Sequence, residues 1–476
     1  MEALSLEYNS ITNRKFLFLF ILFEIGAIFI SFLFSYKIAI LLPLAFVFLI
    51  VILLDAKVSL MILIALSTFV SYKNTTTLAF GMGVLIFVLA AMFLSIYLRF
   101  CIKGLKMMKG KLHLPLVTFI LIVLLNAARG LFCSYKITYW GLETFAYLSF
   151  GLVFLIITFF ESSDDIKRFF NILILLAIFQ SIYGVVNYFL VGHRIGGTIF
   201  GIMPSMIAIV LLNLVFYSRD KRKRFLYLLF SFLPILHLLF SFTRGMWIGF
   251  LGALAFSYAF YVSQLSHARG RKFFLFIRGG MIALVVSFSG LLIFSPFLPG
   301  EGLVGGVLNR FRSGFSLRFS GETVSNYQRV LEYQAAIEKI KEKPVWGYGV
   351  GYGFDFRDWL SQKVYTVRAV HQDYLAIVLK MGLIGLLAFL WLFYVFFRNG
   401  LKIVRELDDE YLKGLSAGFL AVVLQLLLIG FTNHVFIGVM GTFYLAFAIG
   451  SVLVIERGVR ITGRKANALV GSGNQV

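Results

Sequence analysis

The stretch Pro344-Val-Trp-Gly-Tyr-Gly-Val-Gly-Tyr-Gly353 lies in the one long polar segment of this chain, Phe297–His371, together with Tyr327-Gln-Arg-Val-Leu-Glu-Tyr-Gln334. The segment is rich in glycine, aromatic residues and arginine. Almost all of the remaining sequence consists of apolar blocks long enough to cross a bilayer. In a membrane protein, a single large loop of this kind is the expected position of the functional site.

The composition of the chain is that of a membrane protein. Its 476 residues are 60% hydrophobic and only 14% charged, with a mean hydropathy of +0.92. A soluble protein of this size would be about a quarter charged. Because the apolar runs are continuous and do not alternate with polar residues as barrel strands do, we expect an all-α polytopic membrane protein.

The apolar blocks predict fourteen spans, each near the length of about 20 residues that crosses the hydrocarbon. The blocks lie near 16–35, 38–54, 58–72, 78–98, 113–132, 142–160, 169–190, 201–217, 225–242, 247–264, 274–296, 373–397, 414–433 and 436–455. The pairs 38–54 with 58–72 and 414–433 with 436–455 have the weakest patterns. Losing one such pair would leave twelve spans without changing the orientation.

Successive loops are alternately rich and poor in lysine and arginine. The formal net charge is +22, but most of it lies in short loops on one side, so membrane orientation accounts for it and nucleic-acid binding does not. The positive-inside rule places both termini in the cytoplasm and 297–371 outside. The expected organisation is 1–296 N-terminal spans, 297–371 outer loop domain, 372–456 C-terminal spans and 457–476 cytoplasmic tail.

The outer loop has two recognisable parts. Apolar residues recur at helical spacing over Ser325–Glu342, and Pro344 stops the pattern, so we expect an amphipathic helix at the membrane surface or over a cavity. In the following segment, glycines alternate with Tyr348, Val350 and Tyr352. That alternation indicates a flexible aromatic turn that allows close backbone approach to a bound molecule. The nucleotide-binding glycine spacings are absent.

Arginines on the outer side call for an explanation, because the positive-inside rule concentrates basic residues in cytoplasmic loops. Arg194 and Arg244 lie in tight outer turns, and Arg329 and Arg368 lie in the loop. A lone interfacial arginine often only reaches lipid headgroups. Four of them on one side favour anion binding, since the guanidinium presents a fork of donors suited to phosphate.

Histidines at the outer boundary are the candidate proton acceptors. His371 closes the loop directly before a predicted span and is the first choice; His193, beside Arg194, is the second. His434 lies in the last outer turn and is placed to line the same cavity. We expect no metal site, because the outer acids are scattered without paired spacing. Lys380 within a span is expected to pair with a buried carboxylate such as Glu24 or Glu143.

Four local patterns, in order along the chain, resemble the O-antigen ligase/polymerase superfamily of bacterial envelope glycan transferases. They are Arg194-Ile-Gly-Gly-Thr198, Ser241-Phe-Thr-Arg244-Gly-Met-Trp247, Arg329 followed by Pro344-Val-Trp-Gly-Tyr-Gly-Val-Gly351, and His371-Gln-Asp-Tyr-Leu375 followed by Met381-Gly-Leu-Ile-Gly385. The chain departs from the family pattern at Gln372, where asparagine is usual. It departs again at Ile202-Met203-Pro204-Ser205, where Asn-Pro-Asn is expected. The departures concern the acceptor contacts.

The resemblance implies a glycosyltransferase C-like, inverting enzyme of the bacterial inner membrane that needs no metal or cofactor. Its donor would be a glycan on undecaprenyl diphosphate, and transfer would occur on the periplasmic side among membrane lipids. The family's motif residues correspond to Arg194, Arg244 and His371 as catalytic groups and Arg329 as a substrate contact. We add Arg368, His193, Tyr348 and Tyr352 as substrate-binding candidates.

Three functions remain open at this point. A ligase would move finished O-antigen onto lipid A-core, whereas a polymerase would extend the lipid-linked glycan with the same donor. A transporter or flippase of an anionic lipid would also suit an arginine-lined cavity. The sequence shows no internal repeat or matched pair of Gly/Pro-broken helices of the kind found in many transporters, so the transporter ranks third.

Overall fold

The computed structural model describes residues 111–191, 197–241, 243–264, 321–357, 364–367 and 370–472. The predicted spans at 16–35, 38–54, 58–72, 78–98 and 274–296 lie outside these ranges. The described residues all belong to one compact unit.

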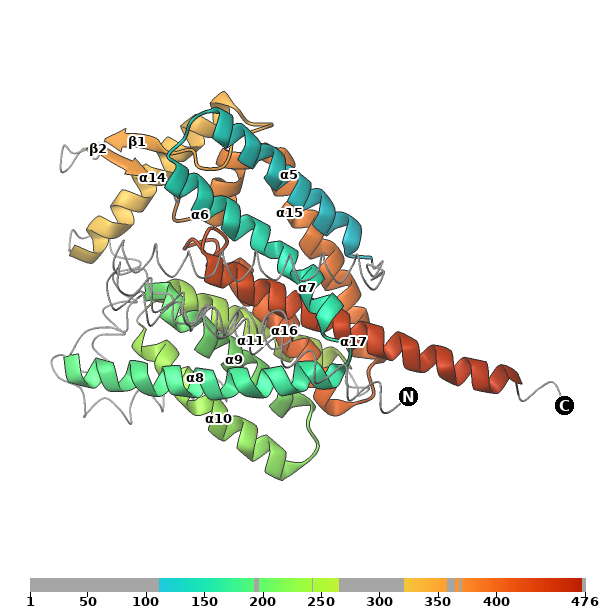
Figure 1. The fold of residues 1–476 in the computed structure, drawn as a ribbon. Coiled ribbons are helices and arrows are strands. Elements are labelled where there is room, and N and C mark those ends of the chain that lie inside the picture. The colour runs from blue at the N-terminus through green and yellow to red at the C-terminus, as the bar shows by residue number, and fades with distance from the viewer. Residues whose placement is uncertain are drawn as a thin grey trace, which may run out of the picture. The chain divides into compact units, whose positions relative to one another are not determined.

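Each predicted span that falls on described residues corresponds to a helical stretch. The helices are α5 His113–Phe132, α6 Ile137–Leu148, η1 Ser149–Gly151, α7 Leu152–Phe159, α8 Ser163–Val191, α9 Gly197–Tyr217, α10 Lys221–Phe240, α11 Arg244–Gln264, α14 Gly321–Glu342, α15 Asp373–Glu406, α16 Glu410–Ile429 and α17 Val439–Ser472 (Figure 1). Within the described part of the chain, eight stretches are long and apolar enough to cross a membrane, with α6, η1 and α7 forming one of them. The prediction of an all-α polytopic membrane protein is confirmed. The weak pair 414–433 and 436–455 is two helices, α16 and α17.

Glycines let α16 lie close to two neighbouring helices. A Cβ added at Gly418 of α16 would lie 2.8 Å from the Cα of Val210 in α9, and Gly414 meets α9 one turn away. On another side, a Cβ at Gly249 of α11 would lie 2.6 Å from Cγ1 of Ile429. Small residues four positions apart allow this approach between membrane helices, where close packing is a main source of association.

The amphipathic helix predicted at Ser325–Glu342 is confirmed as α14, which ends two residues before Pro344. It packs on α15 and on the first strand of a hairpin, and Ala336 on its inner face is fully buried. Figure 1 shows α14 beside the hairpin, near the ends of α5, α6 and α15. Residues 321–357 therefore form a folded layer over the helix ends.

A short hairpin, which was not predicted, belongs to the same layer. Strands β1 Phe354–Arg357 and β2 Val364–Val367 are antiparallel, with Phe354 opposite Val367 and Phe356 opposite Tyr365. The alternation of phenylalanine with Asp355 and Arg357 is typical of a strand with one apolar face. The signal covers only four residues, which is too short to separate from the surrounding glycine-rich sequence.

The glycine-rich segment docks into a break in α15. At Gly382 the backbone leaves helical geometry, with φ 68° and ψ −174°. The N–H groups of Tyr348 and Gly349 donate to the carbonyls of Leu379 and Lys380 at 2.9 and 2.8 Å, and the N–H of Leu383 donates to Pro344 at 2.9 Å. These bonds satisfy backbone groups that the break removes from the helix.

The other side of the same segment is held by α5. The Arg129 guanidinium donates to the carbonyls of Trp346 and Gly347 at 2.8 and 3.1 Å, and the N–H of Val350 donates to Asn126 at 3.0 Å. The glycines therefore allow close backbone approach to α5 and α15, whereas the sequence predicted an approach to a bound molecule.

A buried ion pair lies beneath this segment. The Lys380 ammonium contacts the Glu143 carboxylate, and the two side chains are 0% and 5% exposed. The second Glu143 oxygen accepts the N–H of Gly351 at 2.8 Å. The prediction that Lys380 pairs with a buried carboxylate is confirmed, with Glu143 as the partner.

The helix turns separate into two groups. One end of the bundle, called here the loop end, consists of α14, the hairpin, the glycine-rich segment and the turns at 130–136, 243–245 and 430–438. At the opposite end, Arg219 pairs with Glu410 at 2.9 Å and Arg457 donates to the carbonyl of Ile157 at 3.0 Å. The described turns that the charge pattern assigned to one side of the membrane therefore lie together at the loop end.

Candidate functional site

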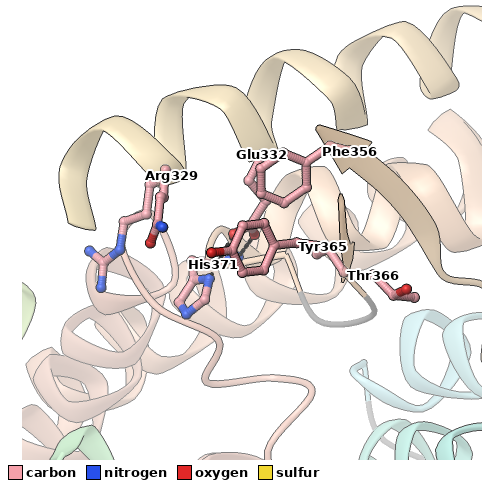
Figure 2. Close-up of a pocket in the computed structure, with 8 residues that line it drawn as sticks. Arg329, Glu332, Phe356, Tyr365, Thr366 and His371 are labelled. Atoms are coloured by element: carbon pink, nitrogen blue, oxygen red, sulfur yellow. Dashed lines mark hydrogen bonds and ion pairs between the residues drawn. The ribbon is translucent and has the colours of Figure 1, made fainter. Parts of the chain in front are cut away.

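A cavity of about 310 Å³ lies between α14, the hairpin and the start of α15 (Figure 2). Its lining combines a cation, an acid, an imidazole and aromatic rings. The lining residues are Gln328, Arg329, Glu332, Phe356, Tyr365, Thr366, Val367 and His371.

His371 is bound at two points by one carboxylate. Nδ1 of the ring lies 2.9 Å from Oε2 of Glu332, and the backbone N–H of His371 donates to Oε1 at 2.6 Å. The hydroxyl of Tyr333 donates to the His371 carbonyl at 3.1 Å. Side chain and backbone of His371 are therefore both positioned by α14.

The arrangement favours one tautomer of the imidazole. A carboxylate accepts a hydrogen bond, so the proton belongs on Nδ1 and the lone pair on Nε2. The His371 side chain is 40% exposed, whereas that of Glu332 is 6% exposed. Nε2 is thus the atom available to take a proton from a molecule in the cavity, and the buried Glu332 would stabilise the resulting imidazolium.

A second imidazole neighbours the first. The ring centroids of His371 and His434 are 5.1 Å apart in an edge-to-face arrangement. The pKa of His434 is lowered to about 4. The main cause is desolvation of the ring by surrounding protein atoms, and the positive charges that His371 and Arg329 can carry lower the pKa further. His434 is therefore neutral near pH 7. It was predicted to line the same cavity; the structure places its ring against that of His371, but His434 is not among the residues that line the cavity.

The turn after α16 connects the site to three helices. Nη1 of Arg329 lies 3.5 Å from the carbonyl oxygen of Thr432. Asp373 at the start of α15 accepts the N–H groups of Val435 and Phe436 at 2.6 and 3.0 Å, which fixes the turn against the His371 segment. A Cβ at Gly245, in the first turn of α11, would lie 2.2 Å from Oγ1 of Thr432. The turn thus brings the Arg244 segment to the same end as Arg329 and His371.

The predicted site residues are distributed as follows. Arg329 and His371 line the cavity, and Arg244 is the first residue of α11. Arg194, His193 and Arg368 lie outside the described residues. Tyr348 and Tyr352 stack on each other with centroids 4.0 Å apart, and the Tyr348 hydroxyl donates to Glu342 at 2.5 Å. Neither tyrosine is among the residues that line the cavity.

Sequence reasoning missed Glu332, the residue that positions His371. Its carboxylate was counted among the acidic side chains of the outer loop, which are scattered along the sequence. The usable signal was its position three residues after Arg329 on an amphipathic helix, since residues at that spacing share a face. Across the described ranges, no group of three or more His, Cys, Asp or Glu residues has the geometry of a metal site.

Residues 229–390 match the family model described as O-antigen ligase. Over these residues the match supports the resemblance to the O-antigen ligase/polymerase superfamily. The O-antigen ligase match extends from α10 into α15, so it contains Arg244, α14, the hairpin and His371. No curated protein matches the sequence. The superfamily implies a glycosyltransferase-like enzyme, in agreement with the resemblance noted in the sequence.

Proposed function

We propose that this protein is an O-antigen ligase-like glycosyltransferase of the bacterial inner membrane. It transfers a glycan from undecaprenyl diphosphate to a hydroxyl of lipid A-core, with inversion at the anomeric carbon and without a metal ion. The loop end of the bundle faces the periplasm in this proposal, because the positive-inside pattern assigns its turns to the outer side.

The reaction is a displacement at the anomeric carbon. The acceptor hydroxyl oxygen attacks that carbon, and the bond from the carbon to the diphosphate oxygen breaks. The hydroxyl proton passes to Nε2 of His371, and the electron pair of the broken bond stays with undecaprenyl diphosphate. Glu332 stabilises the imidazolium that forms, through the hydrogen bond to Nδ1.

The leaving diphosphate needs compensation for its charge. Arg329 lines the cavity beside His371, and we assign Arg194 and Arg244 to the same leaving group. Guanidinium groups stabilise charge that develops during bond cleavage, and they do so most strongly where water is excluded. Three such groups supply the role that a divalent ion has in other transferases.

The observation that carries this proposal is the Glu332–His371 pair in a cavity that Arg329 also lines. The combination offers a proton acceptor and a phosphate ligand within one small volume. It does not distinguish the ligase from a polymerase, which would use the same donor and a growing glycan as acceptor. The products decide between them.

The test uses purified full-length protein in proteoliposomes with undecaprenyl-diphosphate glycan and lipid A-core. We expect glycan-bearing lipid A-core as the product, and a loss of about 10²–10⁴ in rate for His371→Ala. The control is His113→Ala, at the start of α5 and outside the cavity lining. A longer lipid-linked glycan as the main product would support the polymerase reaction instead. Wild-type protein that transfers no glycan to either acceptor would refute the proposal.

A further inference from the structure

The cavity has an aromatic wall that the proposed reaction does not use. Phe356 of β1 and Tyr365 of β2 are direct cross-strand partners, and their rings stack with centroids 5.8 Å apart and an interplanar angle of 26°. Both residues line the cavity. Tyr365 is 37% exposed, so this residue remains accessible at the cavity wall.

The position of the pair in the hairpin separates it from ordinary core packing. Side chains two residues apart on a strand share a face, so Phe354 lies on the same side as Phe356. Phe354 is buried at 4% exposure, whereas the pair further along the hairpin borders the cavity. The hairpin is thus fixed at one end by Phe354 and presents two stacked rings at the other.

We propose that Phe356 and Tyr365 form a sugar-binding subsite that stacks on a pyranose ring of the acceptor. This inference rests on the proposed function. The C–H groups on one face of a pyranose carry partial positive charge, which the negative face of an aromatic ring attracts. Gln328, also in the lining, supplies a side-chain amide that can hydrogen-bond the sugar hydroxyls.

The arrangement of the lining assigns the subsite to the acceptor. In Figure 2, the rings of Phe356 and Tyr365 lie on the other side of His371 from Arg329. In an inverting displacement the leaving group and the attacking hydroxyl lie on opposite sides of the anomeric carbon. If Arg329 binds the leaving diphosphate, the hairpin end is the acceptor end, and His371 lies where the attacking hydroxyl releases its proton.

The experiment replaces the ring and then restores it. Tyr365→Leu keeps an apolar side chain but removes the aromatic face, and Tyr365→Phe keeps the face. Steady-state transfer with lipid A-core and undecaprenyl-diphosphate glycan gives a separate KM for each substrate. We expect Tyr365→Leu to raise the acceptor KM about three- to tenfold, with donor KM and kcat near wild type. Tyr365→Phe should restore the acceptor KM.

The matched control is Val364→Ala, on the same strand but on the opposite face, where Val364 is 65% exposed. It should leave both KM values unchanged. Binding of the oligosaccharide released from lipid A-core, measured by calorimetry without donor, gives a second readout. It should weaken by a similar factor in Tyr365→Leu and be unaffected in Val364→Ala.

The outcomes separate the two proposals. If wild-type protein transfers glycan and Tyr365→Leu has an unchanged acceptor KM, or a raised donor KM alone, the subsite assignment is wrong and the proposed function stands. If wild-type protein transfers nothing, the proposed function is wrong. In that case, oligosaccharide binding equal in wild type and Tyr365→Leu would refute the subsite as well.

Discussion

Oε2 of Glu332 lies 2.9 Å from Nδ1 of His371, while Oε1 of the same carboxylate accepts the backbone N–H of His371 at 2.6 Å. Glu332 comes from α14 and His371 from the residues before α15. One buried carboxylate therefore sets both the direction of the ring and the position of the chain that carries it.

Glu332→Gln tests the positioning role. The amide retains a hydrogen-bonding oxygen but carries no charge to stabilise an imidazolium, so we expect kcat to fall about 10²-fold or more with donor KM near wild type. The comparison is Glu338→Gln on the same helix, whose side chain does not line the cavity. Equal kcat for Glu332→Gln and wild type would exclude the role.

Arginine geometry at the leaving group is tested by Arg244→Lys and Arg329→Lys. Lysine keeps the charge but lacks the planar fork that binds two phosphate oxygens, so each variant should lose about 10²–10³ in kcat. Arg222→Lys makes the same change on an exposed residue near the start of α10 and should keep wild-type activity. Active Arg244→Lys and Arg329→Lys proteins would show that no bidentate contact is needed.

Removal of divalent metals tests the assignment of charge compensation to arginine. Transfer by purified protein should continue at an unchanged rate in excess EDTA, because guanidinium groups neutralise the diphosphate. The measurement is product formation with and without chelator. Activity that EDTA abolishes and magnesium restores would contradict this mechanism.

The Lys380–Glu143 pair predicts a strongly non-additive effect on stability. Lys380→Met leaves a buried carboxylate without its counter-charge and should lower the free energy of unfolding by about 3–5 kcal/mol. Adding Glu143→Gln removes that charge while keeping an oxygen for the N–H of Gly351, so the double variant should recover much of the loss. Thermal unfolding of the purified variants in detergent measures the cycle. A double variant less stable than Lys380→Met would contradict the prediction.

His434 predicts a pH dependence of stability with a defined sign. Its folded-state pKa of about 4 lies below the ordinary value of 6.5, so the unfolded chain binds more protons between these values. Stability associated with this group is present above pH 6.5 and is lost as pH falls toward 4. His434→Gln should therefore show a smaller fall in melting temperature than wild type between pH 7 and pH 4.5. Identical pH profiles would contradict the assignment.

Local sequence patterns predicted the elements well, because spans and amphipathic helices depend on periodicity along the chain. The ends of α5 and the C-terminal end of α14 followed directly from such patterns, whereas α14 begins at Gly321, four residues before its predicted start. The break in α15 was not predicted, because Gly382 leaves helical geometry only where the glycine-rich segment supplies hydrogen bonds. Glu332 was missed for a similar reason: its spacing from Arg329 indicates only a shared helix face, whereas its role depends on His371, 39 residues away.

The anchoring of the glycine-rich segment by α5 also means that the site can form only late in biosynthesis. Arg129 and its carbonyl partner Trp346 are 217 residues apart in sequence, so α5 enters the membrane long before its partner has been translated. The segment also needs Leu379 and Lys380, which are made later still. A nascent chain that stops before α15 thus has many of its spans but no cavity. Synthesis of the chain through α15, and not insertion of the early helices, is therefore the step that completes the cavity.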